Sequence, residues 1–195
     1  MGLEVRDNVH GELVIGQVYP TIGQRRNYSS IIAAALAAGG VAITINTVVL
    51  FAASSIPLVT AHGGLLTLIK PLVGKLLTAS GMVGLWQAAH LPGVHSMIFQ
   101  AGFHIAVGLV MAVVYAIVVE PWLDDRAWRK GLIYALVIWL LNAFLILPAI
   151  GEGIAGLHSI TLGGMLYFAM AHTIFFLLLA ILYSKFLGVI PPTEV

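Results

Sequence analysis

The strongest constraint on this chain is a set of four long apolar stretches separated by polar connections. Each stretch has about 18–25 residues, the length of a helix that crosses about 30 Å of hydrocarbon. Backbone groups find no water in lipid, so such stretches form helices rather than strands. We therefore expect an all-α integral membrane protein whose four transmembrane helices form a bundle, as one domain over residues 30–186. The predicted spans are residues 30–53, 96–119, 130–147 and 162–186.

The composition excludes several classes of protein. Hydrophobic residues make up 60% of the chain and charged residues 9%, whereas soluble domains average about 25% charged residues. The surface must therefore be covered by lipid or by apolar partner subunits. A net charge of +1 gives no electrostatic footprint for nucleic acid. The chain has no cysteine, which rules out disulfides, thiolate nucleophiles and cysteine-based metal sites.

The basic residues predict the orientation of the chain. Lys70 and Lys75 lie in the loop between the first and second spans, and the connection between the third and fourth spans has no Lys or Arg. The other seven fall on the opposite side, which the positive-inside rule places in the cytoplasm. We therefore expect a cytoplasmic N-terminal arm (residues 1–29) and a cytoplasmic C-terminal tail (residues 187–195). The seven are Arg6, Arg25, Arg26, Arg126, Arg129, Lys130 and Lys185.

The loop between the first two spans contains a predicted amphipathic helix over residues 64–79. Its leucines and isoleucine recur at helical spacing on one face. The segment is too short to cross a membrane, and Lys70, Pro71 and Lys75 argue against immersion in hydrocarbon. Two interpretations stay open: an interfacial helix on the outer face, or a helix that packs on a partner subunit.

Each predicted span carries one polar side chain at a similar depth when the rise is counted as about 1.5 Å per residue. These residues are Asn46, His104, Asn142 and His172. An imidazole in hydrocarbon is costly and usually faces a bundle interior or a cavity. Three interpretations follow: hydrogen bonds between helices, axial ligation of a haem b by His104 and His172, or a site for a quinone, a lipid or a proton.

Four further histidines, His62, His90, His95 and His158, fall on or near the predicted outer side. His90 and His95 flank a Pro–Gly turn, and together with His158 they could hold a metal ion. The alternative is that these loop histidines are solvated or hydrogen-bonded. The chain shows no Walker loop, no G-x-S-x-G and no H-E-x-x-H, so we expect no catalytic activity of its own.

The loop EPWLDDRAWRKG, between the second and third spans, has a predicted role in topology. Pro121 is expected to stop the second helix. Trp122 and Trp128 suit the headgroup layer, and Arg129 with Lys130 should hold the third helix on the cytoplasmic side.

Three segments between Gly102 and Tyr183 carry a resemblance: FHIAVGLVMAVVYA, WRKGLIYALVIWLLNAFLILPAIG and MAHTIFFLLLAILY. They look like a family of small four-span bacterial inner-membrane proteins. In that family one histidine opens the second span and another lies early in the last, as His104 and His172 do here. The resemblance implies four spans in a bacterial inner membrane and no particular activity.

The leading functional expectation is a non-catalytic accessory or structural subunit of a larger bacterial membrane complex, with a respiratory or electron-transfer assembly as first choice. Its expected partners are other integral membrane subunits, lipid and quinone. One alternative is a small b-type cytochrome with His104 and His172 as haem ligands. The other is a small transporter or a quinone- or lipid-binding membrane protein.

Overall fold

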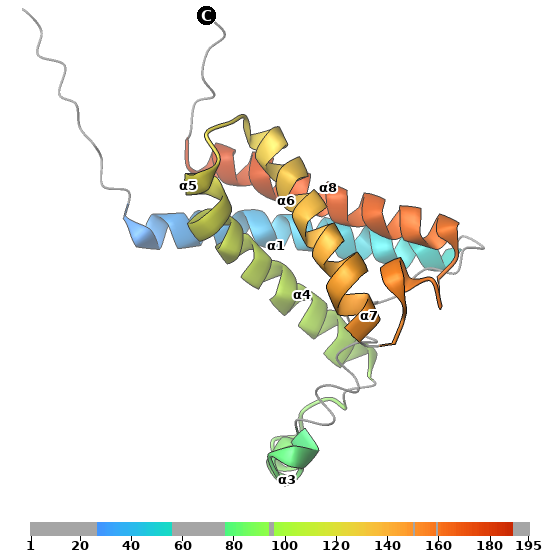
Figure 1. Cartoon of the computed structure of the whole chain (residues 1–195). Coiled ribbons are helices and arrows are strands. Elements are labelled where there is room, and N and C mark those ends of the chain that lie inside the picture. The colour runs from blue at the N-terminus through green and yellow to red at the C-terminus, as the bar shows by residue number, and fades with distance from the viewer. Residues whose placement is uncertain (1–26, 56–76, 94–95, 150, 159, 189–195) are drawn as a thin grey trace, which may run out of the picture.

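The computed structural model describes residues 27–55, 77–93, 96–149, 151–158 and 160–188. Within these residues every regular element is helical, and four helices are long and apolar enough to cross a membrane (Figure 1). Their ends lie within three residues of the predicted spans. The first long helix is α1 (Tyr28–Ala52) and the fourth is α8 (Leu162–Phe186). The second consists of α4 (Met97–Val114), the π-helical turn η2 (Tyr115–Val119) and α5 (Glu120–Trp122). The third consists of α6 (Ala127–Leu141), the π-helical turn η3 (Asn142–Ile146) and α7 (Leu147–Ala149).

Side-chain caps mark the start of three of these helices. The side-chain oxygens of Asn27, Ser96 and Thr161 accept hydrogen bonds from backbone N–H groups in the first turns of α1, α4 and α8. Such caps satisfy donors that have no partner within the helix. The second helix continues through Pro121 and ends at the next residue, Trp122, so Pro121 lies in the last turn of the helix rather than after its end as predicted.

Small residues let the long helices approach closely. Helix α1 packs against both α8 and α4, and α6 packs against α8 (Figure 1). Ala35, Ala38 and Ala42 on α1 are fully buried, and a methyl group added at Gly39 would overlap the Cβ of Ala112 on α4. Close contact between small residues is a common means of association for membrane helices.

Large apolar side chains cover the outward faces of all four long helices. Val48, Val110, Leu136 and Leu166 come from one helix each, and they are 57–64% exposed. Apolar surface on this scale is rare in soluble monomers and normally meets lipid or a partner.

Several predicted segments lie wholly or mostly outside the described residues. They are the N-terminal arm (residues 1–29), the amphipathic helix (residues 64–79) and the C-terminal tail (residues 187–195), of which residues 1–26, 64–76 and 189–195 are not described. The loop before α4 does include a short helix, α3 (Val83–Ala88) (Figure 1), and the ring of its Trp86 lies 5.8 Å from that of Phe99 in α4. The indole of Trp86 in α3 donates to the carbonyl of Pro92 at 3.2 Å.

Candidate functional site

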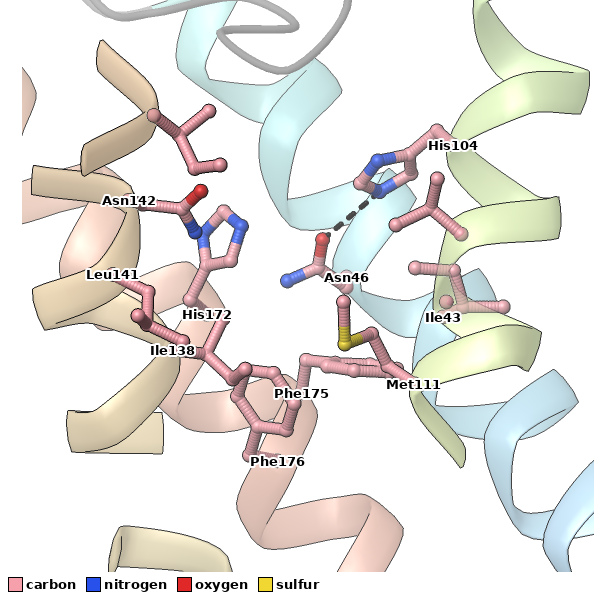
Figure 2. A pocket seen from close by; sticks show the side chains of 13 residues that line it. Ile43, Asn46, His104, Met111, Ile138, Leu141, Asn142, His172, Phe175 and Phe176 are labelled. Atoms are coloured by element: carbon pink, nitrogen blue, oxygen red, sulfur yellow. Dashed lines mark hydrogen bonds between the residues drawn. The ribbon is translucent and has the colours of Figure 1, made fainter. Parts of the chain in front are cut away.

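The four polar residues predicted at a similar depth line a single pocket of about 180 Å³. Asn46 and His104 lie on one side of it, and Asn142 and His172 lie on the other (Figure 2). The rest of the lining is apolar: Ile43, Val107, Gly108, Met111, Ile138, Leu141, Ile146, Phe175 and Phe176. The fold therefore concentrates the polar groups of four helices around one small, otherwise apolar space.

Asn46 joins three helices at this pocket. Its side chain is almost completely buried, and its Nδ2 donates to the carbonyl of Ala171 on α8 at 2.7 Å. A carbonyl can only accept, so this bond sets the orientation of the amide and turns Oδ1 toward α4. There Oδ1 lies 3.1 Å from Nε2 of His104. Nε2 must therefore carry the hydrogen, and in the neutral ring Nδ1 of His104 is left as an acceptor.

His172 has a different tautomer for the same kind of reason. Its Nδ1 lies 2.9 Å from the carbonyl oxygen of Phe168, one turn earlier in α8. Because that carbonyl only accepts, Nδ1 carries the hydrogen and Nε2 is the acceptor. Nε2 faces the interior of the pocket (Figure 2). In the described part of the chain, no residue hydrogen-bonds to Nε2 of His172 or to Nδ1 of His104.

Asn142 lies at a break in helical regularity. It begins the π-helical turn η3, where the N–H of Leu147 bonds to the carbonyl of Asn142, five residues earlier. Such π-helical turns occur often at functional sites. The side-chain amide of Asn142 is half-buried and makes no hydrogen bond with any described residue. Polar groups of this kind usually find a partner in a ligand or in ordered water.

The predicted hydrogen bonds between helices account for one side of the pocket. Asn46 bonds to α4 and α8, whereas His172 bonds within its own helix. The pairing of Asn46 with His104 and the separate bonding of His172 could not be read from the sequence, since both depend on how the helices are rotated against each other. The polar groups with no bond to a described residue are Nδ1 of His104, Nε2 of His172 and the side-chain amide of Asn142.

The geometry disfavours a haem at this pocket. Nε2 of His104 is already engaged by Asn46. A pocket of about 180 Å³ is smaller than the roughly 300–1,000 Å³ that drug-sized ligands occupy, and a porphyrin is at least that large. By contrast, an apolar cavity of about 150 Å³ holds one benzene ring. The pocket therefore suits a ligand with a single ring.

The predicted metal ligands are only partly described. Nδ1 of His90 lies 3.0 Å from the carbonyl oxygen of Ala88, and Nδ1 of His158 lies 2.9 Å from that of Gly151. His95 is outside the described residues. Among the residues that are described, no three His, Asp or Glu side chains are grouped to hold a metal ion. The three-histidine site stays a prediction.

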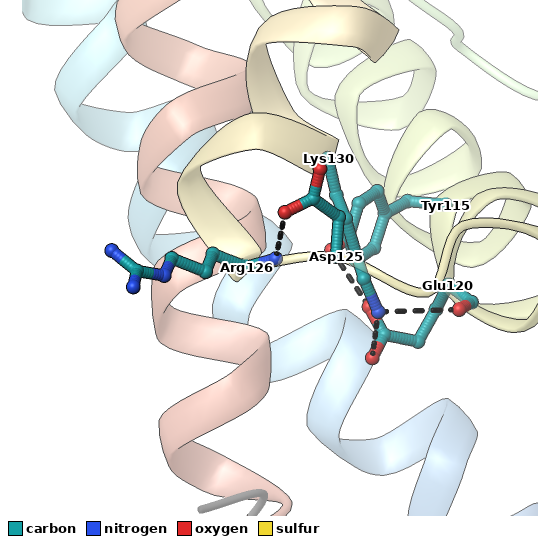
Figure 3. A network of polar contacts seen from close by, with 5 residues as sticks. All are labelled: Tyr115, Glu120, Asp125, Arg126 and Lys130. Atoms are coloured by element: carbon teal, nitrogen blue, oxygen red, sulfur yellow. Dashed lines mark hydrogen bonds and ion pairs between the residues drawn. The ribbon is translucent and has the colours of Figure 1, made fainter. Parts of the chain in front are cut away.

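A second polar cluster was missed in the sequence (Figure 3). Nζ of Lys130 lies 2.9 Å from Oε1 of Glu120, and it donates to the backbone carbonyl of Glu120 at 3.3 Å. The hydroxyl of Tyr115 donates to Oε2 of the same carboxylate at 2.8 Å. The side chains of Lys130 and Glu120 are only 10% and 13% exposed. Lys130 therefore points inward, because a carboxylate and a carbonyl are within its reach.

Aromatic rings connect this ion pair to the pocket. The ring of Tyr115 lies 5.5 Å from that of Tyr183 and 6.0 Å from that of Tyr134. Tyr134 in turn lies 4.5 Å from the ring of Phe176, and its hydroxyl donates to the carbonyl of Met111 at 3.2 Å. Since Phe176 and Met111 also line the pocket, the two polar clusters share one packed core.

The chain matches no protein-family model, no curated protein and no solved structure. The resemblance to the four-span family therefore stays a prediction, and the proposals below rest on the geometry of the pocket.

Proposed function

We propose that this chain is a membrane-embedded binding protein for a small, uncharged, lipid-soluble ring molecule of the quinone class. The observation that carries the proposal is the convergence of two imidazoles and two carboxamides on one pocket of about 180 Å³. Ligand sites in proteins combine an apolar lining with a few placed polar groups in this way.

The proposal includes a multi-pass location in a bacterial inner membrane with both termini in the cytoplasm. Its support is the four long apolar helices, their exposed apolar faces and the unequal distribution of Lys and Arg between the loops. A lipid-soluble ligand would reach the pocket from the same medium that covers the helices.

A single six-membered ring matches the pocket in size and chemistry. The volume is slightly larger than that of a cavity that holds benzene, so any hydrocarbon tail would stay outside. Met111, Phe175 and Phe176 offer apolar contacts to a ring. The acceptor nitrogens of His104 and His172 can take hydrogen bonds from ring hydroxyl groups, and the side-chain amide of Asn142, which has no bond to a described residue, can donate to a ring oxygen or accept from a ring hydroxyl.

The test is calorimetric titration of the chain in lipid nanodiscs with a short-tailed benzoquinone and with its quinol. We expect saturable one-site binding of at least one form. Ile138→Phe, which places a ring in the pocket, should weaken it by about tenfold or more. His90→Asn is the control, because His90 is exposed and outside the pocket. The proposal fails if neither form binds saturably, or if Ile138→Phe binds as the parent does.

The other functional predictions keep their place as alternatives. An accessory subunit needs a face for its partner, but the exposed apolar faces suit lipid and a partner subunit equally. The pocket adds no feature that favours a transporter or a b-type cytochrome over a binding site for one ring.

A further inference from the structure

We infer that the pocket selects the reduced, hydroxyl-bearing form of its ring ligand over the oxidised, carbonyl-bearing form. The inference rests on the proposed function and specifies its substrate class as a phenol or hydroquinone. It follows from which ring nitrogens of the two lining histidines are left as acceptors.

The tautomer of His104 is set by a chain of two hydrogen bonds. The carbonyl of Ala171 orients the amide of Asn46, and Oδ1 of that amide then takes the hydrogen of Nε2 of His104. The lone pair of His104 is thereby placed on Nδ1. Asn46 is a positioning residue in this scheme, since it acts on the ligand through His104.

His172 presents a second lone pair. Its Nδ1–H is engaged by the carbonyl of Phe168, so Nε2 meets the pocket without a hydrogen. A positive charge on either ring, which would convert these acceptors to donors, is costly in a pocket whose lining is otherwise apolar.

Two imidazole nitrogens that accept hydrogen bonds can pair with hydroxyl groups, which donate. They cannot pair with carbonyl oxygens, which only accept. A quinone oxygen beside one of these nitrogens leaves that oxygen and that nitrogen without a hydrogen bond, since both can only accept. Unpaired polar groups in an apolar site weaken binding strongly. Asn142 does not remove this difference, because its amide carries both a donor and an acceptor and serves a hydroxyl as well as a carbonyl.

The test compares three ligands with the same ring on the parent chain in nanodiscs: a short-tailed benzoquinol under anaerobic conditions, its quinone, and its dimethyl ether. We expect the quinol to bind about tenfold or more tightly than the other two. Equal affinities for quinol and quinone, or tighter binding of the quinone, overturn the inference and leave the proposed function standing. Loss of all binding overturns the proposed function itself.

Variants of Asn46 test the tautomer directly. Asn46→Leu frees His104 to place its hydrogen on either nitrogen, so the ratio of quinol to quinone affinity should fall. Asn46→Asp in its neutral acid form can still donate to Ala171 and accept from His104, so it should keep the ratio. Thr47→Val is the matched control, because Thr47 bonds only within its own helix among the described residues.

Nitrogen-15 NMR of the imidazoles should show hydrogen on Nε2 of His104 and on Nδ1 of His172 in the parent chain. The opposite assignment for both rings contradicts the inference without reference to affinity.

Discussion

Lys130 and Glu120 form an ion pair of 2.9 Å at the connection between the second and third long helices, with both side chains largely buried. The same carboxylate accepts a hydrogen bond from Tyr115. Buried ion pairs stabilise little against an apolar replacement of the whole pair, but removal of one partner leaves an uncompensated charge. Each charge of this buried tether between the second and third long helices therefore needs the other in order to stay buried.

Replacement of Lys130 by Met should destabilise the folded chain by about 3–5 kcal/mol, because it leaves the carboxylate of Glu120 buried without its partner. The double variant Lys130→Met with Glu120→Gln should recover much of that loss. The measurement is the free energy of unfolding in mixed micelles, followed by the circular dichroism of the helices.

Arg129→Ala is the matched control for that experiment. Arg129 pairs with Asp125 at 3.3 Å, but the two side chains are 52% and 31% exposed, and exposed pairs contribute about 0–1 kcal/mol. Equal losses in Lys130→Met and Arg129→Ala would contradict the buried tether.

Gly39 and Gly40 are neighbours with opposite expectations. Gly39→Ala should cost about 1–3 kcal/mol, because the new methyl group would overlap the Cβ of Ala112 and force α1 away from α4. Gly40→Ala meets nothing within 4 Å and should be neutral or stabilise α1 by up to about 1 kcal/mol. Thermal unfolding of both variants in the same detergent checks the pair. A larger loss for Gly40→Ala would show that the α1–α4 contact is wrong.

Asn46→Leu should lower stability by about 1–3 kcal/mol, since it removes the bond between helices to the carbonyl of Ala171 and takes away the partner of the Nε2–H of His104. Thr47→Val should change stability much less, because the bond of Thr47 runs to Ile43 in its own helix. Equilibrium unfolding of the two variants decides this. If they lose the same amount, the bonds of Asn46 do not hold the helices together.

The predicted orientation is testable because the chain has no cysteine of its own. His90→Cys should react with a membrane-impermeant maleimide in spheroplasts, and Asp124→Cys should react only after the membrane is broken. Both positions are exposed, so access to the reagent depends on the side of the membrane. The reverse labelling pattern would refute the positive-inside prediction.

The four long helices could be predicted closely because length and hydropathy are properties of the local sequence. The largest differences fall at the second and third helices, which extend to Trp122 and begin at Ala127, against predicted limits of 119 and 130. The first limit assumed that Pro121 follows the end of the helix, whereas Pro121 lies inside its last turn. The π-helical turns at Tyr115 and Asn142 have no residue signature that the sequence analysis could use.

The sequence by itself determined that four apolar helices form and that each carries one polar side chain at a similar depth. Only the tertiary structure decided that Asn46 bonds to His104, that His172 turns to its own helix, and that Asn142 has no bond to a described residue. It also decided that Lys130 turns inward to Glu120. The physical reason is that periodicity and hydropathy fix the depth of a residue along its helix. The rotation of each helix, which decides what a side chain faces, follows from packing between residues far apart in the chain.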